Sequence, residues 1–440
     1  MRGIEASLLV WRDVSSGSFA SEALRKRTGS LPENERALAS TIVFLALRRA
    51  SLWKHIAVTM TGRPLGSLSP AAGDALVLGI AGVTELRTFY PRVLVNALVE
   101  WVKANGADRE SGMINAVLRR AVDEGPKVLE RMKKSRSLKD LSLAYGVPGW
   151  AALLWTGSWG KDRAKELVRL ASMKSFMSLR LSPGADPVEC VSRLMGSGYR
   201  SWRSPLLEES LRMPASAHPP SLPGFSDGAF TPQTESSMIV GKVASSLYKG
   251  GTILDMCSGR GGKACQILQA IPESTVEGWD LSTPRIRAAG QEARRLGLPF
   301  GRLSLRAGDA LKLSPRDQTS LVILDAPCSG SGTWARHPDA KWRQSPEKLG
   351  DLHQLQSRLL ARALDIVLPG GSVLYSTCSL FREENEQVVG EVIEGREDIV
   401  EMPPDNIYHC FNRGRPWGDY ILPKLPWVDG FFIAVLDKRA

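Results

Sequence analysis

Cysteine and histidine are scarce in this chain. Six cysteines and five histidines are spread over 440 residues, too few and too far apart for a fold that depends on disulfides. No two cysteines form a CxxC pair, and the sequence contains no HExxH motif. We therefore expect no metal among the ligands of this protein.

Long apolar runs are also missing. The longest one near the start of the chain covers residues 42–47, whereas a membrane span needs roughly 18 apolar residues. Residues 1–12 lack the apolar core of a signal peptide. We therefore expect no membrane partner and a cytoplasmic location.

The overall composition is that of a folded globular protein. Apolar residues make up 43% of the chain, which also has 41 glycines and 27 prolines, and such a chain can bury a sizeable core. At roughly 150 residues per domain, the length favours two or three domains.

Positive charge is concentrated in the first third of the chain. The formal net charge is +11, and residues 1–140 hold 22 basic but only 14 acidic residues. Such a field favours polyanions, above all nucleic acid, although a basic surface that serves only solubility fits the charge about equally well. A basic run at 131–139 is either a solvated connector or a helix that faces RNA.

The first 140 residues have the periodicity of helices. Apolar residues recur at spacings of three and four in stretches such as 91–104 and 112–124. Ser69 followed by Pro70 offers a helix cap and a first-turn proline. The pattern predicts an all-α N-terminal domain over residues 1–140.

Residues 141–225 have a mixed pattern. A helical stretch at 162–172 precedes a strand-like segment, Ser178 to Ser182, and residues 204–225 are rich in proline and serine. We expect a connecting α+β subdomain that contributes to RNA binding. Its last part, 204–225, is predicted to be a long surface connection that contains the domain boundary.

From residue 226 onward, short apolar strands alternate with helices. Four strands are predicted, at 252–258, 274–280, 321–328 and 372–379. Strands that alternate with helices form parallel βαβ units, so residues 226–440 are predicted to be an α/β doubly wound, Rossmann-like domain. Ligands bind at the carboxyl ends of such strands, where this sequence places acids and cysteines.

A glycine-containing turn, Gly259 to Gly262, follows the first of these strands, and a helix begins near Lys263. Glycine lets a ligand approach the backbone, and a helix N-terminus donates amide hydrogens. Asp280 can accept hydrogen bonds from two ribose hydroxyls, and Asp309 could bind an adenine amino group. The acids favour an adenosine-type ligand. Taken singly, each acid could instead be a helix cap or a turn residue. We favour this alternative for Asp309 and disfavour it for Asp280.

Two cysteines, Cys328 and Cys378, lie at the ends of two other predicted strands. A cysteine thiolate is a strong nucleophile, and a loop beside a cofactor pocket can lower its pKa. Packing is the usual role of a buried cysteine. The proline, glycine and serine around Cys328, and the Thr377 and Ser379 that flank Cys378, favour function instead.

At these residues the chain resembles a known family. The sequences DAPCSGSG at 325–332 and STCS at 376–379, followed by EEN at 383–385, resemble the S-adenosylmethionine-dependent RNA cytosine carbon-5 methyltransferases. Residues 93–103 and 112–120 resemble the helical RNA-binding domain related to the antitermination factor NusB. The combination resembles the bacterial 16S ribosomal RNA methyltransferase B family, also called Sun or Fmu, over nearly the whole chain.

This resemblance implies S-adenosyl-L-methionine as the cofactor and a mechanism with two cysteines. Cys378 would add to carbon 6 of the cytosine, and Cys328 would assist the later release of the enzyme. Asp325 would hydrogen-bond the base, and Lys263 would provide positive charge near the reacting centre. Small-subunit ribosomal RNA would be the partner, and a monomer is the family expectation.

The resemblance also implies the cofactor contacts, which lie in the glycine turn and at the strand ends. They are Cys257, Ser258, Gly259, Arg260, Gly261, Gly262, Lys263, Asp280, Arg285, Asp309 and Asp325. Arg285 has an alternative role as an ion-pairing residue on a helix surface. Arg260 and Ala264 replace the proline and threonine usual in the family, and Arg260 reaches either an anion or solvent. Lys341 and Trp342 either touch RNA or anchor their loop.

The leading hypothesis is therefore methylation of cytosine carbon 5 in 16S ribosomal RNA through a covalent cysteine adduct. One alternative is a transfer RNA cytosine carbon-5 methyltransferase. Another is an RNA-binding assembly factor whose active site has decayed, as the altered glycine turn suggests; retention of both cysteines, Asp325 and Lys263 argues against it. Thiol redox chemistry is weaker still, because Cys257 and Cys265 do not form CxxC.

Overall fold

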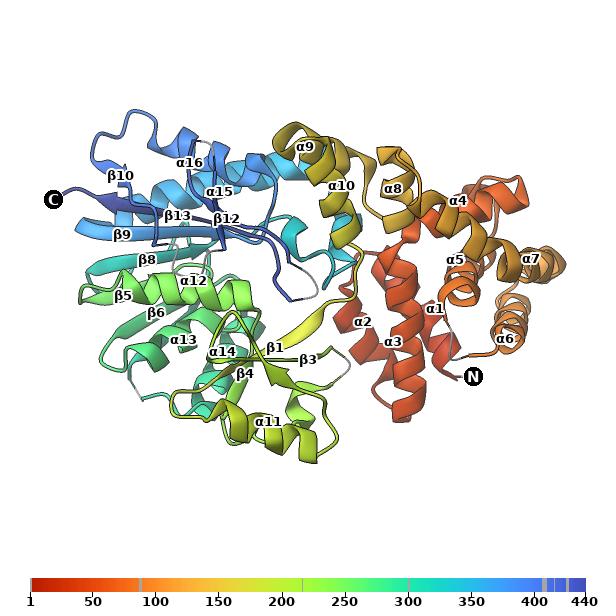
Figure 1. Cartoon of the computed structure of the whole chain (residues 1–440), viewed down its shortest axis with the longest axis horizontal. Helices are drawn as coiled ribbons and strands as arrows, with labels where there is room; N and C mark the ends of the chain where they lie inside the picture. Colours follow the sequence, from red (N-terminus) through yellow and green to blue (C-terminus); the bar gives the residue numbers. More distant parts are fainter. Residues whose placement is uncertain are drawn as a thin grey trace. The chain divides into compact units, whose positions relative to one another are not determined.

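The structure is a computed structural model that describes residues 2–86, 89–215, 217–299, 301–405, 410–414, 416–424 and 427–440. Two compact units form. The first comprises Met1–Ser172 and Trp334–Gln344, and the second comprises Met173–Thr333 and Ser345–Ala440. Figure 1 shows the ribbon coloured along the chain.

The first unit is helical throughout its described residues, as the sequence predicted for the N-terminal domain (Figure 1). Its helices are α1 (Arg2–Ser15), α2 (Ala20–Thr28), α3 (Glu33–Arg48), α4 (Ala50–Thr61), α5 (Pro70–Glu85), α6 (Pro91–Ala104), α7 (Asp108–Lys133), α8 (Leu138–Tyr145), α9 (Gly149–Trp159) and α10 (Lys161–Leu170). Ser69 caps α5 as predicted, because its Oγ accepts a hydrogen bond from Ala72 N at 3.2 Å.

The core of this unit is formed by the apolar stripes of these helices. Leu8, Ile42, Trp53, Leu98 and Leu118, which come from five different helices, have no exposed surface. Their spacing at three and four residues from other buried positions places them on one face of each helix. Burial of a side chain of this size stabilises the fold by about 1.5–3 kcal/mol.

Helices α8 to α10 pack with the first unit, so that the chain divides by packing after Ser172. The boundaries at residues 140 and 225 remain predictions. The basic run at 131–139 extends from the end of α7 into α8, and Arg131 and Lys139 are exposed in it. Exposure of the run is compatible with either role that the sequence allowed.

A segment from the second half of the sequence, Trp334–Gln344, is part of the helical unit. Lys341 has no exposed surface and donates a hydrogen bond from Nζ to the Arg48 carbonyl at 2.8 Å. Trp342 Nε1 donates to the Leu47 carbonyl at 2.6 Å. Burial holds the pKa of Lys341 well below its ordinary value. Of the two roles considered for Lys341 and Trp342, the contacts favour anchoring of the loop.

A small antiparallel sheet opens the second unit. Its strands, in spatial order, are β2 (Trp202–Arg203), β3 (Ser210–Pro214), β1 (Phe176–Leu181) and β4 (Phe230–Pro232). The prediction of one long surface connection over 204–225 is wrong, because β3 pairs with β1 and buries Leu211 and Met213. Arg212 between them is also buried, and its guanidinium pairs with the buried Glu235 at 2.5 Å.

The large sheet of the second unit has nine strands in the described residues, and its main path runs β11-β12-β13-β9-β8-β5-β6-β7. The strands are β5 (Thr252–Asp255), β6 (Thr275–Asp280), β7 (Leu303–Ala307), β8 (Thr319–Asp325), β9 (Val367–Thr377), β10 (Ile399–Glu401), β11 (Phe411–Arg413), β12 (Asp419–Ile421) and β13 (Phe431–Lys438). Strands β5 to β9 pair in parallel, whereas β13 pairs antiparallel with β9. The predicted α/β doubly wound domain is confirmed.

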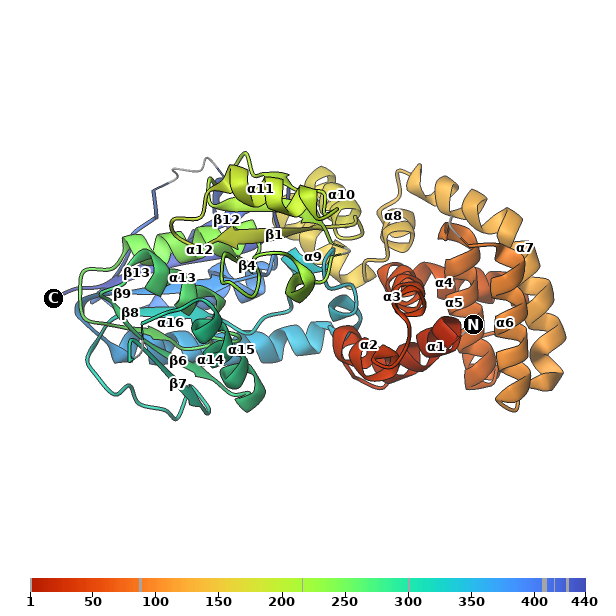
Figure 2. The ribbon, with the colours of Figure 1, turned by 90° about the horizontal axis from the view of Figure 1, so that it is seen from below.

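Helices cover both faces of this sheet. They are α12 (Glu235–Ser246), α13 (Gly262–Ala270), α14 (Thr283–Arg295), α15 (Pro346–Ile366) and α16 (Glu386–Ile393), while α11 (Pro187–Gly196) packs on the small sheet. Figure 2 shows α12 above the strands of the large sheet and α15 below them. Such an arrangement leaves the carboxyl ends of the parallel strands as the place for a ligand.

Within the residues that the structure describes, no helix is long and apolar enough to cross a membrane. The same residues contain no group of three or more His, Cys, Asp or Glu side chains that could hold a metal ion.

Gly146 provides a stability test of the helical unit. It ends α8 with φ +58°, and a Cβ there would lie 2.3 Å from the Arg48 carbonyl oxygen. Gly146→Ala should therefore destabilise the protein by at least about 2 kcal/mol, measured as a lower melting temperature in calorimetry. Gly149→Ala is the matched control, since a Cβ at Gly149 meets nothing within 4 Å. Equal melting temperatures for the two variants would contradict this account.

Candidate active site

The carboxyl ends of four parallel strands bring the predicted site residues to one edge of the large sheet. Asp255 ends β5, Asp280 ends β6 and Asp325 ends β8. In the strand register Asp325 lies opposite Ser376 of β9, two residues before Cys378. The residues that the sequence placed at strand ends are therefore neighbours in the fold.

The glycine turn after β5 is fixed to Asp280. Gly259 N donates a hydrogen bond to Asp280 Oδ2 at 3.0 Å, and Ser282 N donates to Oδ1 at 2.8 Å. Gly261 caps α13 with φ +78°, where a Cβ would lie 2.9 Å from the Ala289 Cβ. Only glycine meets both requirements at this position without strain.

Arg285 lies close to the same carboxylate. Its Nη1 is 3.7 Å from Asp280 Oδ2, and its side chain is 56% exposed. This geometry fits the ion-pairing role that the sequence offered as the alternative for Arg285. Arg260, in the glycine turn, is exposed to solvent.

The remaining members of the predicted cofactor set lie around this turn. Asp309 follows β7, and its Oδ1 accepts a hydrogen bond from Leu311 N at 3.0 Å, which is the turn role considered for it. Gly308 N donates to the Asp280 carbonyl at 3.0 Å, so Asp309 lies beside the end of β6. Cys257 is partly buried, and burial raises the pKa of its thiol far above the ordinary value. Cys257 is therefore protonated at neutral pH.

Lys263 and Asp325 form an ion pair at the centre of the edge. Lys263 Nζ lies 2.5 Å from Asp325 Oδ2, and Asp325 Oδ1 accepts a hydrogen bond from Ser376 Oγ at 3.2 Å. Burial of Lys263 disfavours its charged form, but the carboxylates of Asp325 and Asp255 outweigh burial and raise its pKa. The ammonium group stays charged in the interior.

Asp255 is an ionisable residue of the site that sequence reasoning missed. It has 1% of its surface exposed, and burial raises its pKa to about 7, against the opposing effect of Lys263. The available signal was its place at the last position of β5, which is the position that Asp280 and Asp325 occupy in their strands.

The two cysteines form a contact pair. The Sγ atoms of Cys328 and Cys378 are 3.3 Å apart, close enough for a thiol of one to hydrogen-bond the sulfur of the other. The hydrogen bond with Cys378 raises the pKa of Cys328 well above its ordinary value, and burial adds to the effect. Cys328 therefore keeps its proton at neutral pH.

Backbone contacts hold the two cysteine loops together. Gly332 N donates to the Cys378 carbonyl at 2.9 Å, and the Gly332 carbonyl accepts from Gly430 N at 2.9 Å. Ser331 Oγ accepts from Leu380 N at 2.8 Å. A Cβ at Gly332 would lie 2.1 Å from the Gly430 carbonyl oxygen, so this close approach requires glycine.

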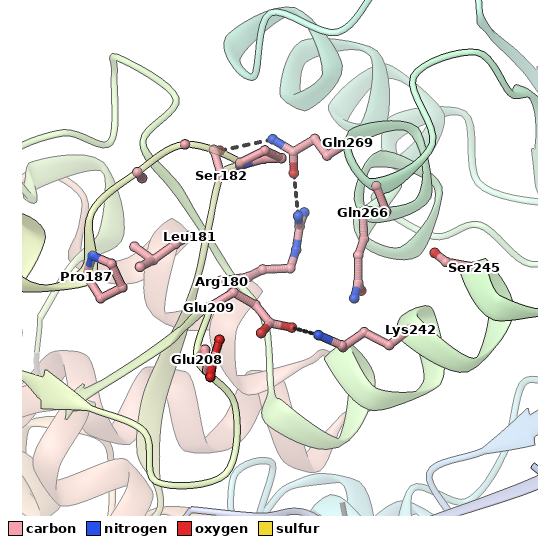
Figure 3. Close-up of a pocket in the computed structure, with 14 residues that line it drawn as sticks. Arg180, Leu181, Ser182, Pro187, Glu208, Glu209, Lys242, Ser245, Gln266 and Gln269 are labelled. Carbon is pink, nitrogen blue, oxygen red and sulfur yellow. Dashed lines mark hydrogen bonds and ion pairs between the residues drawn. The ribbon is translucent and has the colours of Figure 1, made fainter. Parts of the chain in front are cut away.

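A cavity of about 430 Å³ lies elsewhere in the second unit (Figure 3). It is lined by Arg180, Leu181, Ser182, Pro183, Gly184, Ala185, Pro187, Glu208, Glu209, Lys242, Ser245, Gln266, Gln269 and Ala270. Figure 3 shows Arg180 pointing to Gln269, and Glu209 paired with Lys242. None of the predicted site residues lines this cavity, so it is separate from the candidate active site.

The fold and the site define a class of protein. A parallel sheet of this order, with a glycine turn after β5 and an acid at the end of β6, is the arrangement that binds S-adenosylmethionine in Rossmann-like methyltransferases. The protein is an S-adenosylmethionine-dependent methyltransferase.

Comparisons with known proteins narrow the class. A family model described as 16S rRNA methyltransferase RsmB/F matches residues 244–437, and one described as NusB family matches residues 8–123. The chain therefore combines a methyltransferase domain that matches the RsmB/F family of 16S rRNA methyltransferases with a NusB family domain.

Similar proteins match nearly the whole chain. Ribosomal RNA small subunit methyltransferase B of Xanthomonas campestris is 29% identical, over 96% of this chain and 93% of its own. The protein of that name from Vibrio cholerae is 27% identical, over 100% of this chain and 98% of its own. The crystal structure of PH0851 covers 99% of this chain and 98% of its own, with a TM-score of 0.82 and 22% identity, which supports the fold.

The contact between the two thiols predicts how the reactivity of Cys328 depends on Cys378. Cys378→Ala removes the hydrogen bond that raises the pKa of Cys328, so that pKa should fall and Cys328 should react faster with iodoacetamide at pH 8. We expect an increase of about tenfold, the value for one pKa unit, in a rate measured by mass spectrometry across pH. Cys190, which is partly buried in the same unit, is the internal control. An unchanged or slower reaction of Cys328 would show that Cys378 does not hold its proton.

Proposed function

We propose that this protein methylates carbon 5 of a cytosine in small-subunit ribosomal RNA, with Cys378 as the covalent nucleophile. The observation that carries the proposal is the pair of sulfurs 3.3 Å apart, beside the Lys263–Asp325 ion pair at the cofactor edge of the sheet. Methylation of RNA with S-adenosylmethionine as the donor is the activity of its family.

The chemistry requires a nucleophile from the protein. Carbon 5 of cytosine is too weakly nucleophilic to attack a methylsulfonium, so the Cys378 thiolate first adds to carbon 6 and converts the ring to an enamine. S-adenosylmethionine, when bound, supplies an electrophilic methyl group for carbon 5. Loss of the carbon 5 proton then breaks the bond between Sγ and carbon 6, which returns the thiolate to Cys378. Cys328 assists this last step as a base: it gives up its proton to solvent once Cys378 is bonded to carbon 6, and its thiolate then accepts the carbon 5 proton.

The ion pair stabilises charge during the addition. Asp325 accepts a hydrogen bond from the amino group of the base and so orients the ring, while negative charge builds up at nitrogen 3 as the thiolate adds. Lys263 holds a positive charge next to it, in a buried place where water does not weaken the interaction. The cytosine must leave any base stack to reach these groups.

The residues around the glycine turn fit S-adenosylmethionine. Cβ atoms built at Gly259 and Gly262 would meet nothing within 4 Å, so the turn is open on the side where a ligand would lie. Asp280 is held by two backbone amides with its carboxylate at the strand end, where it would accept hydrogen bonds from the ribose hydroxyls. Asp309 would bind the adenine amino group.

Three observations support small-subunit ribosomal RNA as the substrate. Relatives over nearly the full length are named for the small ribosomal subunit RNA, the chain has a NusB family domain, and its first 140 residues are strongly basic. Polyanion binding of this kind weakens as salt rises.

Incubation of the protein with unmodified 16S ribosomal RNA and radiolabelled cofactor tests the proposal. Wild-type protein should transfer label to a cytosine that bisulfite sequencing then identifies as 5-methylcytosine. Cys378→Ala should lower the rate at least about a thousandfold, as expected when a nucleophile is removed, while Cys190→Ala should not. Absence of label with wild type, or label confined to transfer RNA, would contradict the assignment.

Cys328→Ala tests the release step. If Cys328 assists loss of the carbon 5 proton, the variant should complete methyl transfer but remain attached to the RNA through Cys378. A denaturing gel should show a protein–RNA adduct for Cys328→Ala, and the double variant that also carries Cys378→Ala should show none. A Cys328→Ala protein that turns over normally, with no adduct, would rule out this role.

A further inference from the structure

A buried carboxylate lies between the two cysteine loops. Glu384 has no exposed surface, and in the described part of the chain no cation pairs with it. Burial raises its pKa. A buried carboxylate without a cation is costly unless hydrogen bonds satisfy it, so the partners of Glu384 indicate why it is there.

Its hydrogen bonds come from the residues that follow the two cysteines. Glu384 Oε1 accepts from Ser329 N at 2.7 Å, and Oε2 accepts from Ser329 Oγ at 2.5 Å. Oε2 also accepts from Ser379 Oγ. Ser329 follows Cys328 and Ser379 follows Cys378, so one carboxylate is bonded to both loops at a distance of one residue from each sulfur-bearing position.

A third partner extends this contact to the other side of Cys328. Gln356 Nε2 donates to Glu384 Oε1 at 3.1 Å and to the Pro327 carbonyl at 2.8 Å. The residues on both sides of Cys328 are therefore tied, directly or through one amide, to the same carboxylate. Tyr375 OH in turn donates to the Glu384 carbonyl at 2.6 Å and fixes its backbone.

We propose that Glu384 is the positioning residue of the thiol pair, and that its carboxylate sets the separation and orientation of Cys328 and Cys378 by holding both loops. The catalytic meaning of this role rests on the proposed function. The positioning itself is a property of the free protein and is measurable without RNA.

The test measures how fast the two thiols close to a disulfide. Diamide takes up the two electrons and two protons that the thiols release, so its N=N bond is reduced to a hydrazine as the S–S bond forms. Peptide mapping by mass spectrometry distinguishes the Cys328–Cys378 disulfide from any other, so the rate of its formation is measured alone. The wild-type pair should close readily, because the sulfurs are already in contact; a wild-type pair that does not close overturns the proposal.

Two substitutions separate shape from charge. Glu384→Ala removes all four hydrogen bonds and should slow closure at least about tenfold, since small displacements of reacting atoms have large effects on rate. Glu384→Gln should stay within about threefold of wild type, because its amide can accept from Ser329 N and donate to both hydroxyls. Loss of closure in Glu384→Gln to the extent seen in Glu384→Ala overturns the proposal.

Glu386→Ala is the matched control for a buried carboxylate. Glu386 is 5% exposed and bonds Arg382 and the Tyr420 hydroxyl rather than the residues after the cysteines. The Glu386→Ala substitution should lower the melting temperature without slowing formation of the Cys328–Cys378 disulfide. Equal slowing by Glu386→Ala and Glu384→Ala would reduce Glu384 to a general structural role and overturn the proposal. Should Glu384→Ala fail to fold, Ser379→Ala removes one of the four bonds to the Glu384 carboxylate, together with the bonds of Ser379 Oγ to Ser329, Ser331 and Phe381 N. It should slow closure at least about threefold; no slowing overturns the proposal.

Methyl transfer gives an independent reading. Glu384→Ala should lower kcat and leave both the KM for RNA and the Kd for S-adenosylmethionine unchanged, because it touches neither ligand. If wild-type protein transfers no methyl group, the proposed function fails while the rate of disulfide closure still decides the role of Glu384.

Discussion

The parallel pairing of β8 with β9 is the constraint on which the rest of the site depends. Asp325 lies opposite Ser376 in this register, so the loops that leave the two strands begin side by side. Three residues after Asp325 and two after Ser376, the sulfurs of Cys328 and Cys378 are 3.3 Å apart. Neither cysteine could act as half of a pair without this strand pairing. The hydrogen bond from Gly332 N to the Cys378 carbonyl holds the two loops together.

Electrostatics then sets the charge state of the buried groups. The hydrogen bond with Cys378 and burial keep the proton on Cys328. Lys263 keeps its charge in the interior because Asp325 and Asp255 outweigh the cost of burial. A charged lysine beside a carboxylate that touches the base can offset negative charge as it develops, which is how buried electrostatic sites accelerate reactions.

The strand ends could be predicted from the sequence because parallel strands have a strong local pattern, and acids and cysteines stood where each apolar run stopped. Strand β3 could not. Its buried Arg212 is charged, and only its pairing with Glu235, 23 residues away, makes that burial tolerable. Lys341 was ambiguous for the same reason, because its acceptor is a carbonyl of Arg48, far away in the sequence. Glu384 stood inside a marker sequence, but its bonds to both cysteine loops follow from tertiary structure alone.

The central claim is that the Cys378 sulfur bonds to carbon 6 of a cytosine. A 16S ribosomal RNA that contains 5-fluorocytosine tests it most directly, because fluorine at carbon 5 cannot leave as a proton and the adduct should therefore persist. After incubation with S-adenosylmethionine and digestion, mass spectrometry should find a methylated fluorocytosine attached to the peptide that contains Cys378. Attachment through Cys328, or no adduct from a protein that methylates the ordinary RNA, would contradict the account.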